Sequence, residues 1–148
     1  MRHIIAKQEV CMGCGLCEVY CLVEHSKSKD IIKAYKKEYP KPVSRIRLEK
    51  AQPVSLSIQC QHCDNPPCVF SCLSGAMRID KQTGKVTHNE EKCIGCWTCI
   101  MVCPFGAVLR DPNGAKVVAK CDLCPNLEIP ACVSNCPNEA LTYEEVYS

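Results

Sequence analysis

The sequence predicts an α+β protein of two pseudo-symmetric halves, each built from short β-hairpins and small helices. Sixteen of the 148 residues are cysteine, whereas only five are Tyr, two are Phe and one is Trp. So few aromatic residues limit the apolar core, and small chains of this kind usually depend on covalent or metal cross-links. The cysteines also repeat in four similar groups, and short runs of alternating polarity lie between and around these groups.

The four cysteine groups share an opening C-x2-C and a closing x3-C. The first and third groups follow C-x2-C-x2-C-x3-C, whereas the second and fourth are stretched at the middle gap. In chain order the groups are Cys11, Cys14, Cys17 and Cys21; Cys60, Cys63, Cys68 and Cys72; Cys93, Cys96, Cys99 and Cys103; and Cys121, Cys124, Cys132 and Cys136. One repeated motif therefore accounts for every cysteine of the chain.

This spacing favours iron–sulfur clusters over the other uses of cysteine. Thiolate is the soft ligand that such clusters require, and a [4Fe–4S] cluster takes four. Three closely spaced cysteines can wrap one face of a cluster if the backbone bends sharply, and Gly13, Gly15 and Gly95 permit the positive φ that such bends use. Four-cysteine zinc sites usually join two C-x2-C pairs across a longer loop. A zinc-stapled interaction module is the distant alternative.

The intervals between the groups favour pairing the second group with the third and the first with the fourth. The long segment 22–59 separates the first two groups, which argues against a compact unit made of them. Residues 77–80 and 85–87 alternate in polarity and predict a β-hairpin between the second and third groups. Residues 4–5 and 141–143 both resemble short strands, whose pairing would join the two ends of the chain. The competing scheme pairs first with second and third with fourth, with the same sixteen ligands.

In the bacterial ferredoxin motif, the cysteine after the x3 gap ligates the other cluster of a pair. Applied to the favoured scheme, this rule gives four ligand sets: Cys11, Cys14, Cys17 and Cys136 (cluster 1); Cys121, Cys124, Cys132 and Cys21 (cluster 2); Cys60, Cys63, Cys68 and Cys103 (cluster 3); and Cys93, Cys96, Cys99 and Cys72 (cluster 4). The outer half then comprises residues 1–59 and 113–148, and the inner half comprises residues 60–112.

The four groups, together with Cys-Pro-Phe-Gly-Ala at 103–107 and Cys-Pro-Asn-Glu-Ala at 136–140, resemble the four-cluster electron-transfer subunits of the molybdopterin oxidoreductase superfamily. The resemblance implies the crossed pairing, two ferredoxin-like halves and a non-catalytic subunit. Some members replace one cysteine with Trp and carry a three-iron cluster. Because Trp97 adjoins Cys96 without replacing it, the resemblance implies four [4Fe–4S] clusters here. The ending Cys-Leu-Ser-Gly-Ala at 72–76 departs from the common pattern and is interpreted as a variant of the same turn.

A narrower resemblance lies in residues 21–28, Cys-Leu-Val-Glu-His-Ser-Lys-Ser, which are similar to the small iron–sulfur subunit accompanying nickel carbon monoxide dehydrogenases. It implies electron relay from that enzyme to a hydrogenase or ferredoxin downstream. Residues 59–63 and 67–68 fit this subgroup, and they also fit relatives that serve hydrogenases and tungsten or molybdenum aldehyde or formate oxidoreductases. The latter role is the alternative function.

The insertion 22–59 carries nine basic and four acidic side chains. Residues 29–38 predict a short helix with Ile31, Ile32, Ala34 and Tyr35 as an apolar stripe, and residues 45–49 predict a half-exposed strand. The segment is either a solvated surface or a docking surface for an acidic partner.

The remaining residues point away from other functions. The chain shows no candidate nucleophile, general base or nucleotide-binding loop, and it has few aromatics to stack on nucleic acid. The four histidines are expected on the surface or in hydrogen bonds rather than as metal ligands, with His62 placed to tune its cluster. The sequence has neither a membrane-spanning stretch nor an export signal, which predicts a cytoplasmic location.

Overall fold

Four two-stranded antiparallel sheets and five short helices make up the computed structural model, which describes residues 1–113 and 118–146. In chain order the elements are β1 (Arg2–Ala6), α1 (Leu16–Glu24), α2 (Ile31–Lys36), β2 (Arg47–Ala51), β3 (Val54–Ile58), α3 (Pro67–Phe70), β4 (Met77–Ile79), β5 (Val86–His88), a 3-10 turn (Glu90–Lys92), α4 (Thr98–Val102), β6 (Val108–Arg110), β7 (Val118–Lys120), α5 (Ala131–Ser134) and β8 (Leu141–Glu145). These short strands and helices agree with the predicted α+β character.

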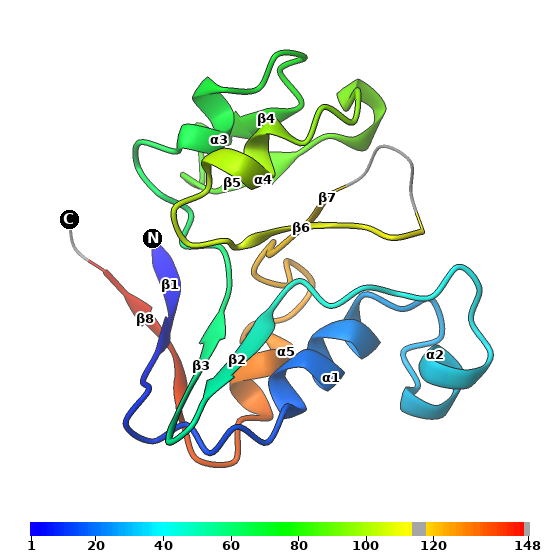
Figure 1. The fold of residues 1–148 in the computed structure, drawn as a ribbon, viewed down its shortest axis with the longest axis vertical. Helices are drawn as coiled ribbons and strands as arrows, with labels where there is room; N and C mark the ends of the chain where they lie inside the picture. Colours follow the sequence, from blue (N-terminus) through cyan, green and yellow to red (C-terminus); the bar gives the residue numbers. More distant parts are fainter. Residues whose placement is uncertain (114–117, 147–148) are drawn as a thin grey trace.

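The two ends of the chain pair with each other, as predicted. Strand β1 is antiparallel to β8, with Ile4 opposite Tyr143 and Ala6 opposite Leu141. Both strands lie beside the two termini at one edge of the molecule (Figure 1). The predicted hairpin between the second and third cysteine groups is also confirmed, because β4 pairs with β5 in the register Ile79–Val86. Strand pairing thus joins the first group to the fourth and the second to the third.

Two further hairpins were not expected from the sequence. Strand β2 overlaps the predicted strand 45–49 but starts two residues later, and its partner is β3. Strand β6 pairs with β7, and this hairpin lies across the expected boundary between the halves at residue 112. Residues 54–58 alternate between apolar residues and serine, as a strand does, whereas β6 and β7 have three residues each and are too short to show a clear pattern. The division into two pseudo-symmetric halves stays a prediction.

The helices pack in the same two pairs as the strands. Helix α1 contacts α5, and α3 contacts α4. Helix α1 carries Cys17 and Cys21 and α5 carries Cys132, while α3 carries Cys68 and α4 carries Cys99. In Figure 1, α3 and α4 lie together with β4 and β5 at one end of the molecule, and α1 and α5 lie together at the other. Each helix pair therefore brings cysteines of two distant groups toward one another.

The core is formed largely by the cysteines. The larger buried cluster contains Ile4, Ile46, Leu123 and Leu141 packed with cysteines of the first and fourth groups. The smaller cluster combines Met77 and Val86 with Cys68, and other cysteines of the second and third groups pack against it. Because large apolar residues are scarce, cysteine side chains occupy core positions that larger apolar side chains occupy in most proteins.

The insertion forms the predicted helix as α2, which begins after Asp30, whose side chain accepts a hydrogen bond from the Lys33 N–H at 2.8 Å. Its apolar stripe is not packed as expected, because only Ala34 is buried while Ile31, Ile32 and Tyr35 are exposed. Figure 1 shows α2 projecting away from the sheets. Within the described residues, no helix is long and apolar enough to cross a membrane.

The pairing of the termini generates a stability prediction. Replacing the buried Ile4 by Ala removes packing atoms at the β1–β8 pair, and we expect a loss of about 2–5 kcal/mol in the free energy of unfolding. The matched control is Ile32→Ala, which truncates an isoleucine that is 64% exposed and is expected to cost less than about 0.5 kcal/mol. Anaerobic thermal melts followed by circular dichroism measure both. Equal melting temperatures for the two variants would contradict the structural role of the terminal strand pair.

Candidate iron–sulfur cluster sites

The opening C-x2-C turns of all four groups share one backbone conformation. The residue before the second cysteine has a positive φ in each case, namely Gly13 (68°), His62 (48°), Gly95 (72°) and Leu123 (62°). Glycine adopts this conformation readily, whereas His and Leu do so only where surrounding structure imposes it. The four opening turns therefore share one left-handed residue, which the glycines of the sequence indicate only for the first and third groups.

Three groups also share the turn after their last cysteine. The N–H groups of Gly75, Gly106 and Glu139 donate to the carbonyls of Cys72, Cys103 and Cys136 at 3.2–3.3 Å, and all three donor residues have positive φ. The interpretation of residues 72–76 as a variant of this turn is thus confirmed. The first group differs, because Cys21 lies inside α1 and the helix continues beyond it.

The structure gathers the cysteines of the expected sets 1 and 4 around two hollows. One hollow is lined by Cys11, Cys14, Cys17 and Cys136, together with Leu48 and Leu141. The other is lined by Cys72, Cys93, Cys96 and Cys99, together with Met77 and Trp97. Each hollow combines three cysteines of one group with the last cysteine of a group far away in the sequence.

The expected sets 2 and 3 also converge. Burial, followed by the nearby thiols of Cys121, Cys21 and Cys124, raises the pKa of Cys132 well above its usual range. Burial and the thiols of Cys60 and Cys103 likewise raise the pKa of Cys68 to about 11. Burial raises the pKa of Cys121 to about 12 and that of Cys124 to about 11. These thiols are near enough to interact and too buried to ionise without a compensating positive charge.

The donor chemistry of these sites fits [4Fe–4S] clusters. All sixteen cysteines are free thiols. In an apolar surrounding, thiolates that repel one another are stabilised by positively charged metal, and iron–sulfur clusters supply it through four cysteine bonds each. Thiols brought together in sets of four from paired motifs therefore match a cluster ligand set better than they match isolated structural cysteines.

Contacts between neighbouring sets indicate an order along the molecule. The Cys17 thiol of set 1 acts electrostatically on Cys132 of set 2, and Cys60 of set 3 acts on Cys121 of set 2. The Cys99 thiol of set 4 acts on Cys68 of set 3. These electrostatic interactions connect the expected sets in the series 1, 2, 3, 4, in which sets 2 and 3 are the inner ones. Cys14 in set 1 and Cys96 in set 4 are the two exposed cysteines, so the solvent-facing thiols belong to the two ends.

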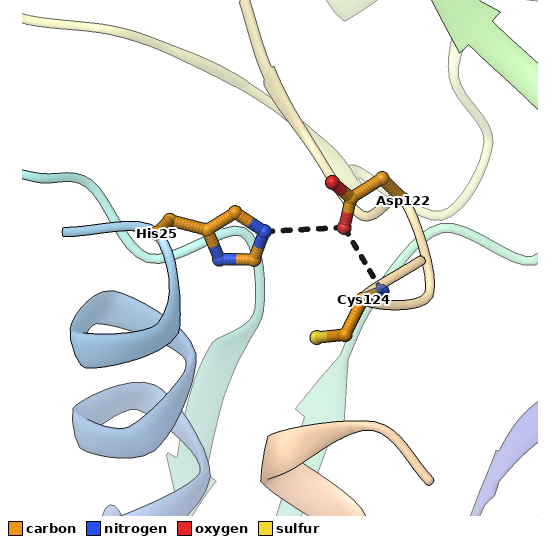
Figure 2. A group of neighbouring side chains, drawn as sticks. All are labelled: His25, Asp122 and Cys124. Atoms are coloured by element: carbon orange, nitrogen blue, oxygen red, sulfur yellow. Dashed lines mark hydrogen bonds and ion pairs between the residues drawn. The ribbon is translucent and has the colours of Figure 1, made fainter. Parts of the chain in front are cut away.

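A network of charged side chains lies beside the cysteines of set 2, and Figure 2 shows three of its residues, His25, Asp122 and Cys124. The Asp122 carboxylate accepts from His25 Nε2 at 3.1 Å, from the Cys124 N–H at 3.1 Å and from Arg45 Nη1 at 2.5 Å. His25 Nδ1 lies 2.7 Å from the Cys21 carbonyl and 3.7 Å from its Sγ, and the Arg45 N–H donates to the same Sγ at 3.2 Å. Residues 21–25, Arg45 and residues 122–124 are distant along the chain, and their side chains therefore meet around the Cys21 and Cys124 thiols.

The hydrogen bonds and ion pairs of this network shift the pKa values of His25 and Asp122. Burial alone lowers the pKa of His25, but hydrogen bonds to Asp122 and Cys21 outweigh it and raise the pKa to about 9. Burial similarly disfavours the Asp122 carboxylate, yet His25 and Arg45 hold its pKa well below its usual range. One ligand atom each of His25, Asp122 and Cys124 lies within 4.8 Å of the other two. Because hydrogen bonds already engage both Asp122 oxygens, this trio forms part of the cysteine site rather than a separate metal site.

His3 and His62 also form hydrogen bonds, whereas the buried Nε2 of His88 has no hydrogen-bond partner within the described residues. His3 Nδ1 lies 2.9 Å from the Gln61 carbonyl, and His62 Nδ1 accepts from the Val86 N–H at 3.1 Å. Burial lowers the pKa of His62 to about 3, so its imidazole is neutral. His62 is buried against β5, and its N–H lies 3.4 Å from Cys60 Sγ. The sequence did not indicate Arg45 or Asp122, because neither belongs to the cysteine spacing and their partners are far away along the chain.

Comparison with known proteins agrees with the cysteine sites. The 4Fe-4S dicluster domain matches residues 52–146, which contain the second, third and fourth cysteine groups. The electron transport protein HydN of Escherichia coli K12 is 37% identical over 155 residues, covering 95% of this chain and 86% of HydN. The polyferredoxin-like subunit of an aliphatic sulfonate oxidoreductase from Pyrococcus furiosus is 40% identical over 134 residues, covering 90% of this chain and 70% of that subunit.

Other matches differ in length or only share the fold. The protein AegA of Escherichia coli K12 is 38% identical over 147 residues, and the chain spans 21% of its length. Among solved structures, a chain of the active site complex BamBC of benzoyl coenzyme A reductase superposes with a TM-score of 0.54 at 21% identity. The superposition covers 97% of this chain and 76% of that one.

The Asp122 network generates a prediction about set 2. Asp122→Asn removes the charge that joins His25 to Arg45, and hydrogen bonds to charged groups contribute about 1.5–3 kcal/mol each. We expect a lower melting temperature and faster release of iron to a chelator from about one quarter of the sites. The control is Glu49→Gln, which breaks the exposed ion pair with Arg47 and should change stability by less than about 1 kcal/mol. Identical iron-release traces for the two variants would contradict a supporting role for Asp122.

Proposed function

Because the chain belongs to the 4Fe-4S dicluster family, whose members named above include electron transport proteins, we propose that it carries four [4Fe–4S] clusters and relays single electrons along them. Each cluster, when bound, takes up and releases one electron at a potential set by hydrogen bonds, burial and nearby charge. The observation that carries the proposal is the gathering of the thiols into sets of four from paired motifs.

The proposed ligands are the four crossed sets. Cluster 1 is held by Cys11, Cys14, Cys17 and Cys136; cluster 2 by Cys121, Cys124, Cys132 and Cys21; cluster 3 by Cys60, Cys63, Cys68 and Cys103; and cluster 4 by Cys93, Cys96, Cys99 and Cys72. The protein contributes the thiolates, shields the two inner clusters from water and leaves the exposed Cys14 and Cys96 near the surfaces through which electrons enter and leave. It has no catalytic step of its own under this proposal.

The proposed partner is a larger catalytic oxidoreductase in the cytoplasm. The resemblance of residues 21–28 favours a carbon monoxide dehydrogenase as electron donor, with a hydrogenase or a ferredoxin as acceptor. The second candidate partner is a tungsten or molybdenum aldehyde or formate oxidoreductase. The relationship to a subunit of a sulfonate oxidoreductase supports the general role of an accessory subunit and is compatible with either partner.

The basic insertion is the proposed docking surface for this partner. Lys33, Lys36 and Lys37 are exposed on or beside α2. The nearby acids are already engaged: Glu24 pairs with Lys29, Asp30 caps α2, and Glu38 accepts from the N–H groups at 27 and 28. The surface therefore has an excess of free positive charge beside exposed apolar residues, which suits a partner with an acidic surface.

The metal content tests the cluster proposal. We expect about sixteen iron and sixteen acid-labile sulfide atoms per chain in anaerobically purified protein, as four cubanes require.

Crossed ligation makes a separate prediction about pairs of cysteines. Cys136→Ser combined with Cys96→Ser should damage two clusters, whereas Cys136→Ser combined with Cys14→Ser should damage one. Electron paramagnetic resonance and iron analysis distinguish these results. Damage to a single cluster in the first double variant would support the competing scheme, and zinc without sulfide would overturn the electron-transfer function in favour of a zinc-stapled module.

The partner is tested by anaerobic purification from the source cells and mass spectrometry of the stable complex. Co-purification of a carbon monoxide dehydrogenase supports the first candidate, and an aldehyde or formate oxidoreductase supports the second.

The docking surface is tested with the partner so identified. The double variant K33E/K36E should weaken association with this partner at least about tenfold at low salt, because charged surfaces steer association. The control K81E reverses an exposed lysine on the β4–β5 hairpin. Equal weakening by both changes would contradict docking at α2.

A further inference from the structure

Lys120 is a buried lysine that forms no ion pair within the described residues. It ends β7, directly before Cys121, and only 5% of the residue is exposed. Its Nζ donates to the Val86 carbonyl at 2.5 Å and to the Cys121 carbonyl at 3.0 Å. Within residues 1–113 and 118–146, no carboxylate lies within ion-pair distance of this Nζ. Burying an unpaired ammonium costs several kcal/mol, so a compensating charge is needed nearby.

The surroundings of Lys120 do not provide that charge. A cavity of about 230 Å³ beside it is lined by further basic groups, including Arg45 and Lys85, and by the acids Glu90 and Asp122. Asp122 is already engaged by Arg45 and His25. Glu90 is exposed and forms no ion pair with Lys120. The protein side of this region is therefore rich in positive charge.

Lys120 lies between the two inner cysteine sets. Its carbonyl partners are in different parts of the fold, since Val86 belongs to β5 and Cys121 begins the fourth cysteine group. Val86 lies in the same buried cluster as Cys68, and the second carbonyl partner of Lys120 is that of Cys121 itself. Cys121 belongs to set 2 and Cys68 to set 3. One ammonium thus acts on both inner sets at once.

From this placement we propose that Lys120 is a positioning residue whose ammonium compensates the charge of clusters 2 and 3 and raises their reduction potentials. The inference rests on the proposed function. A [4Fe–4S] cluster with four thiolates carries about −2 when oxidised, and reduction by one external electron adds one more negative charge. A nearby cation attracts that added charge, so it favours the reduced form. Lys120 would therefore ease electron entry into the interior of the relay.

The test is a redox titration of the cluster-loaded protein with dithionite, followed by electron paramagnetic resonance. Lys120→Met keeps the apolar stem and removes the charge, Lys120→Arg keeps the charge, and Lys81→Met removes a charge that is exposed to solvent. We expect Lys120→Met to shift the reduction equilibrium of two clusters at least about tenfold toward the oxidised form, which is about 59 mV for one electron. Lys120→Arg should stay near the parent protein, and Lys81→Met should leave all four potentials unchanged.

Three results decide the matter. If Lys120→Met retains about sixteen irons and its four potentials match those of the parent, the proposal is overturned. If Lys120→Met fails to assemble clusters while Lys120→Arg assembles all four, the requirement for charge is supported by iron content alone. If neither variant assembles them, shape rather than charge is required at this position, and the proposal fails. A parent protein that itself lacks iron and sulfide would instead refute the proposed function, so the two failures are distinguishable.

Discussion

The clustering of sixteen thiols, six of which are buried, is the constraint on which the rest of this structure depends. A chain with so few large apolar residues places cysteines in both of its hydrophobic clusters, where burial raises the pKa of several thiols to about 11 or 12. A folded state that gathers such groups needs positive charge among them if they are to act as thiolates. The fold can therefore be understood as a scaffold whose short elements are stabilised chiefly by what the thiols bind.

The same constraint explains why the chain is folded back on itself. The strand pair β1–β8 and the helix pair α1–α5 hold the first cysteine group against the fourth, while β4–β5 and α3–α4 hold the second against the third. If the last cysteine of each group serves the neighbouring cluster, each cluster also cross-links two distant segments. Loss of one ligand would then loosen the contact between segments as well as one metal site, because ligation closes long loops of the chain.

Charge is distributed around these sites in two ways. The thiols of Cys21 and Cys124 are supported by a network in which the cations His25 and Arg45 share the Asp122 carboxylate. Lys120 forms no ion pair within the described residues, and it lies buried against the Val86 and Cys121 carbonyls. If Lys120 acts as proposed, the protein uses paired charges to hold cysteine ligands in place and the charge of Lys120 to act on the electrostatic potential of the interior.

The sequence by itself determined the chemistry of this protein, because thiolate spacing is a local property that the printed residues display directly. It also indicated the terminal strand pair, the β4–β5 hairpin and α2, since each has a local pattern of polarity. Tertiary structure alone decided the β2–β3 and β6–β7 hairpins, the exposure of Ile31 and Ile32, and the positive φ at His62 and Leu123. It likewise placed Asp122 beside His25 and Arg45 and buried Lys120 between two cysteine sets. The Asp122 network joins segments that are distant in the chain, and a polar residue outside any local pattern gives no sign of its distant partners.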